Sequence, residues 1–435
     1  MTKKPTLQQI ITIGFAMFAI YFGAGNLIFP PTLGFQAGAQ WWIVLLGFAI
    51  TGVGLPILGV IAIAQAGGTV ESLMRPFGRG FSVLIGAVVA LCIGPLFCIP
   101  RTAATTYEMT VAPLFHTNAT MAPALTAVVF FVITAFLTIR QSRVIDIIGR
   151  YLTPGLLLIL AIIIITAIVN PPGELASKEV VHGFGIGFRE GYQTMDAIGS
   201  ILVGALMIAD VVRKGFKTRE EQLAVMRPAG AVAAVCMALV YGGLGYVGAT
   251  CSTLLPTEAG RVELLISAVD TLLGAAGTLA IGAAVALACL TTAIGLTSMV
   301  SHYFSDITKN RVSYKVFAIG ICIFAAFMSI LGVDAIINMA VNVLVVLYPV
   351  LIVIITMNLF DKLIKYKTAY IGAVGISFII SLLEVWSAHS EGLQQFIKSI
   401  PLAEAGFSWF VPAIIFGIIF YIVGMMNNDK WVAKK

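Results

Sequence analysis

The stretch YFGAGNLIFPP, at residues 21–31, interrupts an apolar run that is otherwise long enough to cross a membrane. Glycine costs about 1 kcal/mol and proline about 3 kcal/mol in a helix interior, so the glycines and paired prolines of this stretch disfavour a continuous helix. One interpretation is a kink at a glycine-packed interface. The other is a discontinuous helix, whose freed carbonyls bind a cation while its second half directs a helix N-terminus at an anionic group.

The composition of the whole chain is that of a membrane protein. Of the 435 residues, 59% are hydrophobic and only 11% are charged, and the mean hydropathy is +1.01, whereas soluble domains have roughly 25% charged residues. The six cysteines lie in or beside apolar runs without C-x-x-C spacing, so we interpret them as packing residues and not as disulfide or zinc ligands. No HExxH or GxxxxGK[ST] motif occurs. The sequence therefore predicts no enzyme, no cofactor and no nucleic-acid partner.

Charge-poor segments recur along the chain and predict an all-α polytopic bundle of about twelve transmembrane helices. No connection between them is long enough for a soluble domain, so residues 1–435 are expected to form a single transmembrane domain. The segments are residues 7–30, 41–66, 81–113, 118–139, 151–170, 191–212, 228–253, 264–303, 316–333, 335–360, 368–388 and 405–426.

Basic residues separate strongly when the connections are assigned alternately to the two sides of the membrane. Of the 26 Lys and Arg residues, one lies within a span and four lie on one side, so 21 remain for the side that includes both termini. Cytoplasmic loops carry the excess of Lys and Arg, which places both termini in the cytoplasm. The four residues on the opposite side are Lys178, Arg189, Arg261 and Lys398.

A second interruption is expected in the sixth span, at TMDAIGS, residues 194–200, where Asp196 is an intramembrane carboxylate close to a glycine. The two breaks lie five spans apart, so spans one to five and six to ten enter the membrane from opposite faces, as in an inverted repeat. We expect repeat one at about residues 7–170, repeat two at about 190–360 and two additional helices at about 368–426. The alternative for Asp196 is an outer-end residue in contact with headgroups or water.

The third span contains a basic and an acidic residue, Arg101 and Glu108, seven positions apart and therefore on one face of a helix. Two interpretations are open. The residues form a structural ion pair that locks neighbouring helices, or they form a gate whose partners change during a cycle.

The eighth span carries the stretch ALACLTTAIGLTS, residues 286–298, with two adjacent threonines. Threonines in membrane helices commonly bond back to their own backbone. Alternatively, Thr291 and Thr292 supply hard oxygen ligands for a sodium ion. The stretch GLGYVG, residues 243–248, matches the spacing of a dinucleotide fingerprint, but it lies in an apolar span without a preceding strand, so we interpret the match as chance.

Three of these stretches together resemble the signature sequences of the bacterial branched-chain amino acid:cation symporters, the BrnQ-type carriers. They are YFGAGNLIFPP, GPLFCIPRTAATTYE at residues 94–108 and GYQTMDAIGS at residues 191–200, and the resemblance covers nearly the whole chain. It implies a LeuT-like transporter with a five-plus-five inverted repeat and broken helices 1 and 6. It also implies uptake of leucine, isoleucine and valine with sodium, in the bacterial plasma membrane.

The resemblance also implies a cation site that joins spans one and eight. Its ligands would be the carbonyls of Ala19, Phe22 and Ala288 and the hydroxyls of Thr291 and Thr292. A second sodium site in the wider group needs Asn26 and an asparagine on span seven. Residues 228–253 contain no asparagine, so we expect one sodium.

The function we expect is alternating-access symport of a branched-chain amino acid. Its carboxylate would meet the amides around Gly25 and Asn26, and its ammonium would meet carbonyls and Asp196 in span six. A proton-coupled carrier that uses Asp196 or Glu108 is the alternative, and a channel or sensor is less favoured because repeated polar rings are absent. The sequence does not indicate an oligomeric state. The expected substrate-binding residues are Gly23, Ala24, Gly25, Asn26, Thr194, Asp196, Ala197 and Gly199.

Overall fold

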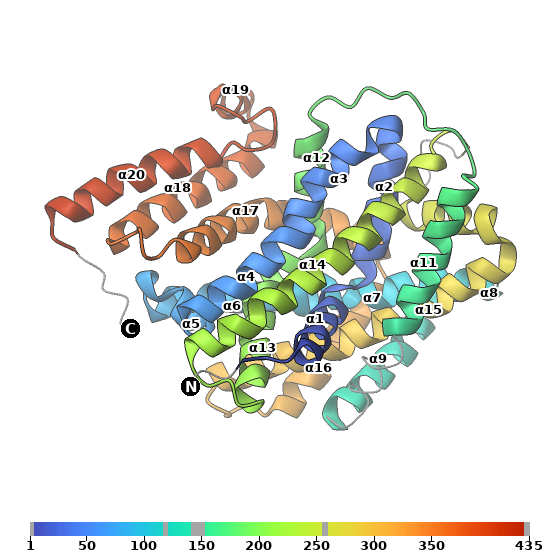
Figure 1. Ribbon diagram of the computed structural model, residues 1–435, viewed down its shortest axis with the longest axis horizontal. Coiled ribbons are helices and arrows are strands. Elements are labelled where there is room, and N and C mark those ends of the chain that lie inside the picture. Colours follow the sequence, from blue (N-terminus) through green and yellow to red (C-terminus); the bar gives the residue numbers. More distant parts are fainter. Residues whose placement is uncertain (1–3, 116–120, 141–152, 255–259, 430–435) are drawn as a thin grey trace.

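The computed structural model describes residues 4–115, 121–140, 153–254 and 260–429, and every regular element in these ranges is helical. Six of the 21 basic residues counted above on the side of the termini lie outside the described residues. They are Lys3, Arg143, Arg150, Lys430, Lys434 and Lys435. The α-helices are α1 (Leu7–Tyr21), α2 (Ala24–Ala37), α3 (Trp41–Ala49), α4 (Leu55–Ala66), α5 (Val70–Leu73), α6 (Arg79–Leu91), α7 (Cys98–Thr106), α8 (Ala112–Phe115), α9 (Ala122–Arg140), α11 (Thr153–Val169), α12 (Gly183–Glu190), α13 (Asp196–Arg213), α14 (Arg219–Thr250), α15 (Arg261–Ile307), α16 (Tyr314–Ser329), α17 (Val333–Leu359), α18 (Lys367–Trp386), α19 (Glu391–Ser399) and α20 (Phe410–Met426). Short 3-10 and π-helical turns join several of them. Figure 1 shows how the α-helices are arranged.

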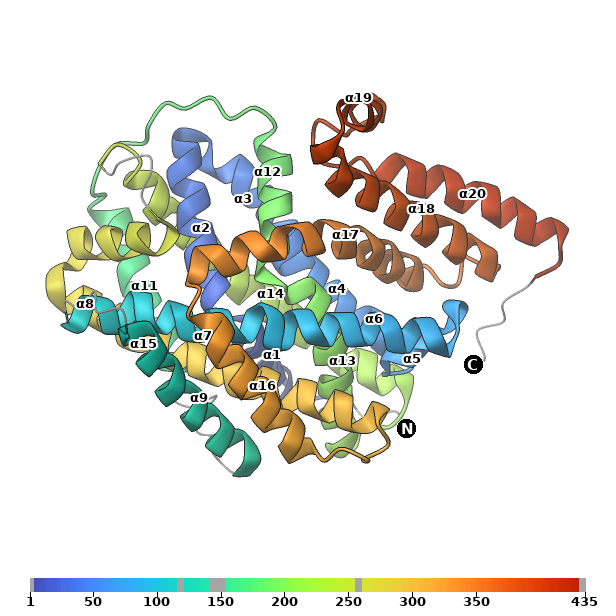
Figure 2. The ribbon, with the colours of Figure 1, turned by 180° about the vertical axis from the view of Figure 1, so that it is seen from behind.

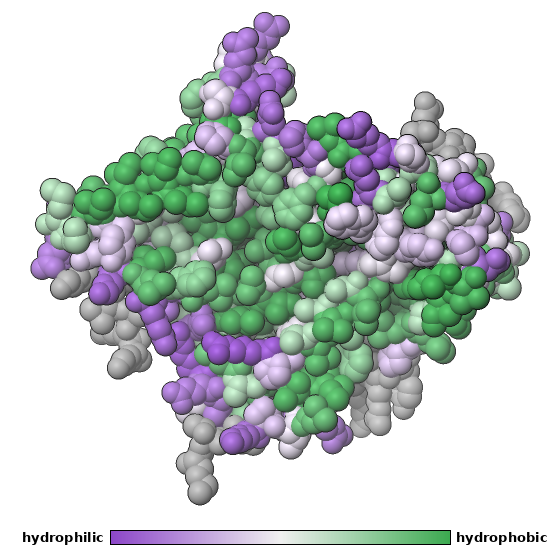
Figure 3. Space-filling model, turned by 45° about the horizontal axis from the view of Figure 1, so that its top comes forward, coloured by the Kyte–Doolittle hydropathy of each residue, from purple (hydrophilic) through white to green (hydrophobic). Residues whose placement is uncertain are grey.

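The helices form a bundle whose surface is largely apolar, as expected for a protein surrounded by lipid. Within the described ranges, seven helical segments are long and apolar enough to cross a membrane, or eight if one bent pair counts as a span, and four shorter apolar helices accompany them. Large apolar side chains point outward, such as Val132, Ile165 and Ile418. One face of the molecule shows hydrophobic side chains over its middle, with hydrophilic ones towards its edges (Figure 3). The exact number of twelve spans stays a prediction.

The first span is broken as predicted, but its prolines do not make the break. Helix α1 ends at Tyr21, and α2 begins at Ala24 after an extended Gly23. Pro30 and Pro31 lie inside α2. A proline has no N–H to donate to the carbonyl four positions earlier, so α2 continues through Pro30 and Pro31 without two of its internal hydrogen bonds.

A long uninterrupted helix, α14, packs along both halves of the broken first span. The backbones approach closely because glycines lie at the contact. A Cβ on Gly34 of α2 would lie 1.8 Å from the carbonyl oxygen of Gly245, and a Cβ on Gly248 would lie 1.9 Å from that of Pro31. The glycines of GLGYVG therefore pack helices together, in agreement with our rejection of a nucleotide site.

The sixth span is also broken, with a bend of 45° between the segment Gly183–Thr194 and α13. The break falls at Met195, which has the left-handed backbone angle φ of 62°, and Asp196 is the first residue of α13. The glycine of the predicted break, Gly199, lies instead inside α13. The additional helices α18 and α20 pack against each other at one side of the bundle, where α17 contacts α18 (Figure 2).

Candidate functional site

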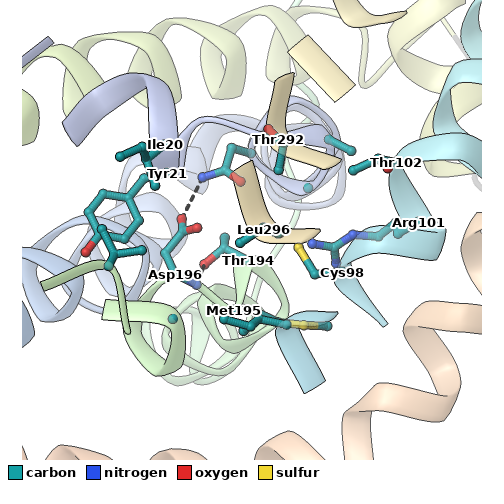
Figure 4. Close-up of a pocket in the computed structure, with 17 residues that line it drawn as sticks. Ile20, Tyr21, Cys98, Arg101, Thr102, Thr194, Met195, Asp196, Thr292 and Leu296 are labelled. Atoms are coloured by element: carbon teal, nitrogen blue, oxygen red, sulfur yellow. Dashed lines mark hydrogen bonds between the residues drawn. The ribbon is translucent and has the colours of Figure 1, made fainter. Parts of the chain in front are cut away.

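The two broken helices meet at one small pocket in the bundle (Figure 4). Span one contributes Gly23, Ala24, Gly25 and Asn26, span six contributes Thr194, Asp196 and Gly199, and Arg101 of α7 and Thr292 of α15 close the remaining sides. Its cavity volume is about 30 Å³, enough for one or two water molecules. The helices are therefore closed around the pocket in this conformation, and an amino acid needs them to move apart.

The rest of the pocket wall is mostly aliphatic. Four aliphatic side chains from different helices line it, together with Met195 at the break. They are Ile20, Ile93, Val203 and Leu296. Gly199 adds room, because a Cβ there would meet only Ile93, at 3.8 Å. Apolar walls with a few convergent polar groups are typical of small-molecule sites, and this wall suits a branched aliphatic side chain.

Asp196 lies in the pocket and is only 7% exposed. Its position is fixed by the break, because Asp196 is the first residue of α13. The side-chain amide of Asn26 donates to Asp196 Oδ2 at 2.6 Å and also to the hydroxyl of Tyr241 on α14. Asp196 is thus a buried pocket residue joined to the break in span one, and the alternative of contact with headgroups is wrong.

Spans one and eight, which carry the predicted cation ligands, approach each other at Gly23 and Thr292. Carbonyls in the last turn of α1, including that of Ala19, lack intrahelical donors because the helix ends at Tyr21. A Cβ on Gly23 would lie 3.3 Å from the Thr292 hydroxyl oxygen, and this buried oxygen has no hydrogen-bond partner. Thr291 instead donates to the carbonyl of Ala288 at 2.8 Å, the common bond of a threonine to its own helix. Thr292 therefore has the stronger evidence for a ligand role.

The predicted pair of Arg101 and Glu108 is not formed in this structure. Arg101 donates to the carbonyl of Gln193 at 2.6 Å, whereas Glu108 accepts from the backbone N–H of Val333 at the start of α17, at 2.9 Å. Seven residues are two helical turns, so the backbones of Arg101 and Glu108 lie about 10 Å apart along the axis, and Glu108 lies in the π-helical turn Tyr107–Val111. The structural ion pair is therefore wrong for this conformation, and a change of partners during a cycle stays a prediction.

The structure brings together most of the substrate-binding residues predicted from the sequence, but not all the predicted ligands. Ala197 is buried but does not line the pocket, and Glu108 lies elsewhere. The pocket wall also lacks Ala19, Phe22, Ala288 and Thr291, so the complete five-oxygen cation site stays a prediction.

Sequence reasoning predicted an apolar pocket for the branched side chain but did not identify the residues of its aliphatic wall, Cys98 or the partner of Asn26. Aliphatic residues occur throughout these helices, so nothing in the sequence marks the few that face the pocket. Tyr241 lies beside the glycines of GLGYVG, where a partner of Asn26 on span seven was sought only among asparagines. Tyr241 is one of several hydrogen-bonding side chains on that span, so the sequence alone does not single it out.

Comparisons with known proteins agree with this architecture. The model of the family described as "Branched-chain amino acid transport protein" matches residues 6–427. A putative branched-chain amino acid carrier protein of Staphylococcus haemolyticus is 36% identical, covering 97% of this chain and 98% of the relative. The branched-chain amino acid permease BrnQ of Bacillus subtilis is 32% identical, covering 98% of this chain and 99% of the permease.

Solved structures of transporters share the fold. MhsT in complex with L-phenylalanine gives a TM-score of 0.59 at 16% identity, covering 98% of this chain and 99% of MhsT. A Na+-coupled sialic acid symporter in a substrate-bound outward-open state also gives 0.59, at 15% identity, covering 95% of this chain and 89% of the symporter. The two broken helices around one pocket, the LeuT-like fold and the family match together show that the chain belongs to the branched-chain amino acid transport protein family, whose members are multi-pass membrane transporters and not enzymes.

Proposed function

We propose that the chain is a sodium-coupled symporter that imports leucine, isoleucine and valine by alternating access. It would act in the bacterial plasma membrane, with both termini in the cytoplasm. The observation that carries the proposal is the pocket between the two helix breaks, because it combines an aliphatic wall with the buried carboxylate of Asp196. A branched-chain amino acid offers the matching groups, an apolar side chain and an ammonium.

The substrate would lie across the two breaks. Its carboxylate would meet the start of α2, where backbone amides around Gly25 and Asn26 favour an anion. Its ammonium would meet Asp196, at the opposite break. Its side chain would lie against Ile93 and Leu296. MhsT is named with a bound amino acid, and the Bacillus subtilis relative is named as a branched-chain amino acid permease, which supports this substrate class.

Sodium is the coupling ion that the donor set favours. Carbonyl and hydroxyl oxygens are the ligands of hard cations, and the partnerless hydroxyl of Thr292 faces the end of α1. One of the transporters that share the fold is named as Na+-coupled. One sodium ion that moves down a tenfold gradient and a 100 mV potential releases about 1.4 plus 2.3 kcal/mol, enough in principle for several-hundred-fold accumulation of substrate.

Uptake by the purified full-length carrier in proteoliposomes tests the proposal. Sodium and pH gradients are imposed separately, and radiolabelled leucine, isoleucine and valine are supplied. We expect uptake to follow an inward sodium gradient at fixed pH, with alanine and lysine as control substrates that compete poorly. Uptake driven equally by a proton gradient without sodium would refute sodium coupling and favour the proton-coupled alternative. Absence of leucine uptake under both gradients would refute the transport function itself.

A further inference from the structure

Arg101 is a buried cation that points into the pocket. The residue is only 2% exposed, although arginine is rarely buried without a paired charge. Its side chain extends from α7 towards the centre of the pocket, on the side opposite to Asp196 (Figure 4). Its guanidinium reaches the start of α2, because a Cβ on Gly25 would lie 2.7 Å from Arg101 Nη2.

The guanidinium still has free hydrogen-bonding capacity. Nη1 donates to the carbonyl of Gln193 at 2.6 Å, and the ring of Phe29 lies 5.6 Å from the guanidinium carbon, which holds the group in position. Nε is buried without a partner. Arginine has five N–H donors, so the contacts in the structure leave donors for an additional acceptor.

Arg101 and Asp196 are a basic and an acidic side chain that line the same pocket. Among the described residues, neither belongs to an ion pair. Buried charges without a paired partner are costly in free energy. A ligand with one anionic and one cationic group, placed between the two side chains, would compensate both charges at once. An α-amino acid zwitterion has these two groups next to each other on one carbon.

We infer that Arg101 binds the α-carboxylate of the substrate, while Asp196 binds its α-ammonium. This inference rests on the proposed function and adds a residue and a selection rule to it. The carboxylate is held by the guanidinium together with the N-terminus of α2, so both anion-favouring features converge at Gly25. Compounds with the same side chain that lack the carboxylate, such as leucinol, bind weakly for this reason.

The experiment measures direct binding of leucine and of leucinol to the full-length carrier in nanodiscs, by isothermal titration calorimetry in the parent and in each variant. Leucinol keeps the ammonium and the side chain but has CH₂OH in place of the carboxylate. In the parent we expect leucinol to bind about 10- to 100-fold more weakly than leucine, the ratio for one charge-assisted hydrogen-bonding contact. In Arg101→Gln, leucine binding should fall to the level of leucinol, whereas leucinol binding should change little.

Arg261→Gln is the matched control. Arg261 also lies over the ring of Phe29, at 5.8 Å, but it pairs with Glu190 and Asp334 and does not line the pocket. The ratio of leucine to leucinol affinity should keep its parental value in this variant. If Arg101→Gln weakens both ligands equally, Arg101 only supports the helices and the inference is overturned.

A third variant keeps the inference testable if Arg101→Gln does not fold. Arg101→Lys keeps a positive charge but loses the planar fork that binds a carboxylate through two N–H groups. The ratio should fall severalfold and stay above one. An unchanged ratio would overturn the inference. Failure of the parent to bind leucine would refute the proposed function instead, so the two failures are distinguishable.

Discussion

Replacement of Thr292 by valine separates a sodium ligand from a packing residue. Valine has nearly the shape of threonine but no oxygen, and the hydroxyl of Thr292 is buried without a partner. An unsatisfied buried hydroxyl costs about 1–3 kcal/mol. Without sodium, Thr292→Val should therefore be at least as stable as the parent, by up to about this amount.

Sodium should reverse this order of stability. At 100 times its dissociation constant, an ion bound only by the folded state stabilises it by about 2.7 kcal/mol. The parent should gain this stabilisation, and Thr292→Val should lose most of it together with sodium-dependent leucine uptake. Thr292→Ser keeps the oxygen, so its sodium concentration for half-maximal uptake should stay near that of the parent. Thr292→Ala loses both the oxygen and the packing, so this concentration should rise steeply.

The assay is thermal unfolding of the purified carrier in sodium and in choline buffers, with uptake at matched membrane abundance. Thr105→Val is the control, because the hydroxyl of Thr105 is likewise buried and partnerless but lies outside the pocket. This variant should keep the sodium response of the parent. A Thr292→Val carrier with unchanged sodium dependence of stability and uptake would contradict a ligand role for Thr292.

Three further predictions concern the pocket. Asp196→Asn keeps an oxygen for the amide of Asn26 but loses the charge that faces the ammonium of the substrate. Leucine uptake should therefore fall at least about 10-fold at normal membrane abundance, and full activity would contradict this role. Gly199→Ala adds a methyl group that meets only Ile93, so the carrier should still fold. Its substrate preference in competition assays should shift from leucine towards valine, and an unchanged preference would count against this pocket. Cys98 lines the pocket, so saturating leucine should slow the modification of its thiol by a small thiol reagent. Mass spectrometry measures the rate, with Cys98→Ala as the control, and equal rates with and without leucine would show that leucine binds elsewhere.

The helix breaks could be predicted from the sequence because they depend on local properties. Gly23 permits an extended residue between α1 and α2, and the intramembrane Asp196 marks the start of the second half of span six. The exact residue of the second break could not be predicted. It falls at Met195, a residue type that rarely adopts a positive φ, because tertiary contacts around it and not its own preference determine the backbone there.

The roles of Arg101 and Glu108 could not be predicted because they depend on winding and on distant elements. The spacing of seven assumes an uninterrupted α-helix, whereas a π-helical turn begins at Tyr107, between the two residues. The partners that each residue found, Gln193 and Val333, are backbone groups. No pattern of side chains in the sequence indicates where a distant backbone carbonyl or N–H will lie.

The close packing of α14 against the broken first span determines how the break behaves. A discontinuity in a helix is commonly a hinge, but here both halves lie against one continuous helix, with glycines at the contact that leave no room for a methyl group. A movement of α2 that brought Gly34 closer to α14 would press its backbone against the carbonyl of Gly245. Under the proposed function, a cation that binds the carbonyls at the end of α1 does not have to order the chain first, and its binding free energy remains available to change the arrangement of the surrounding helices.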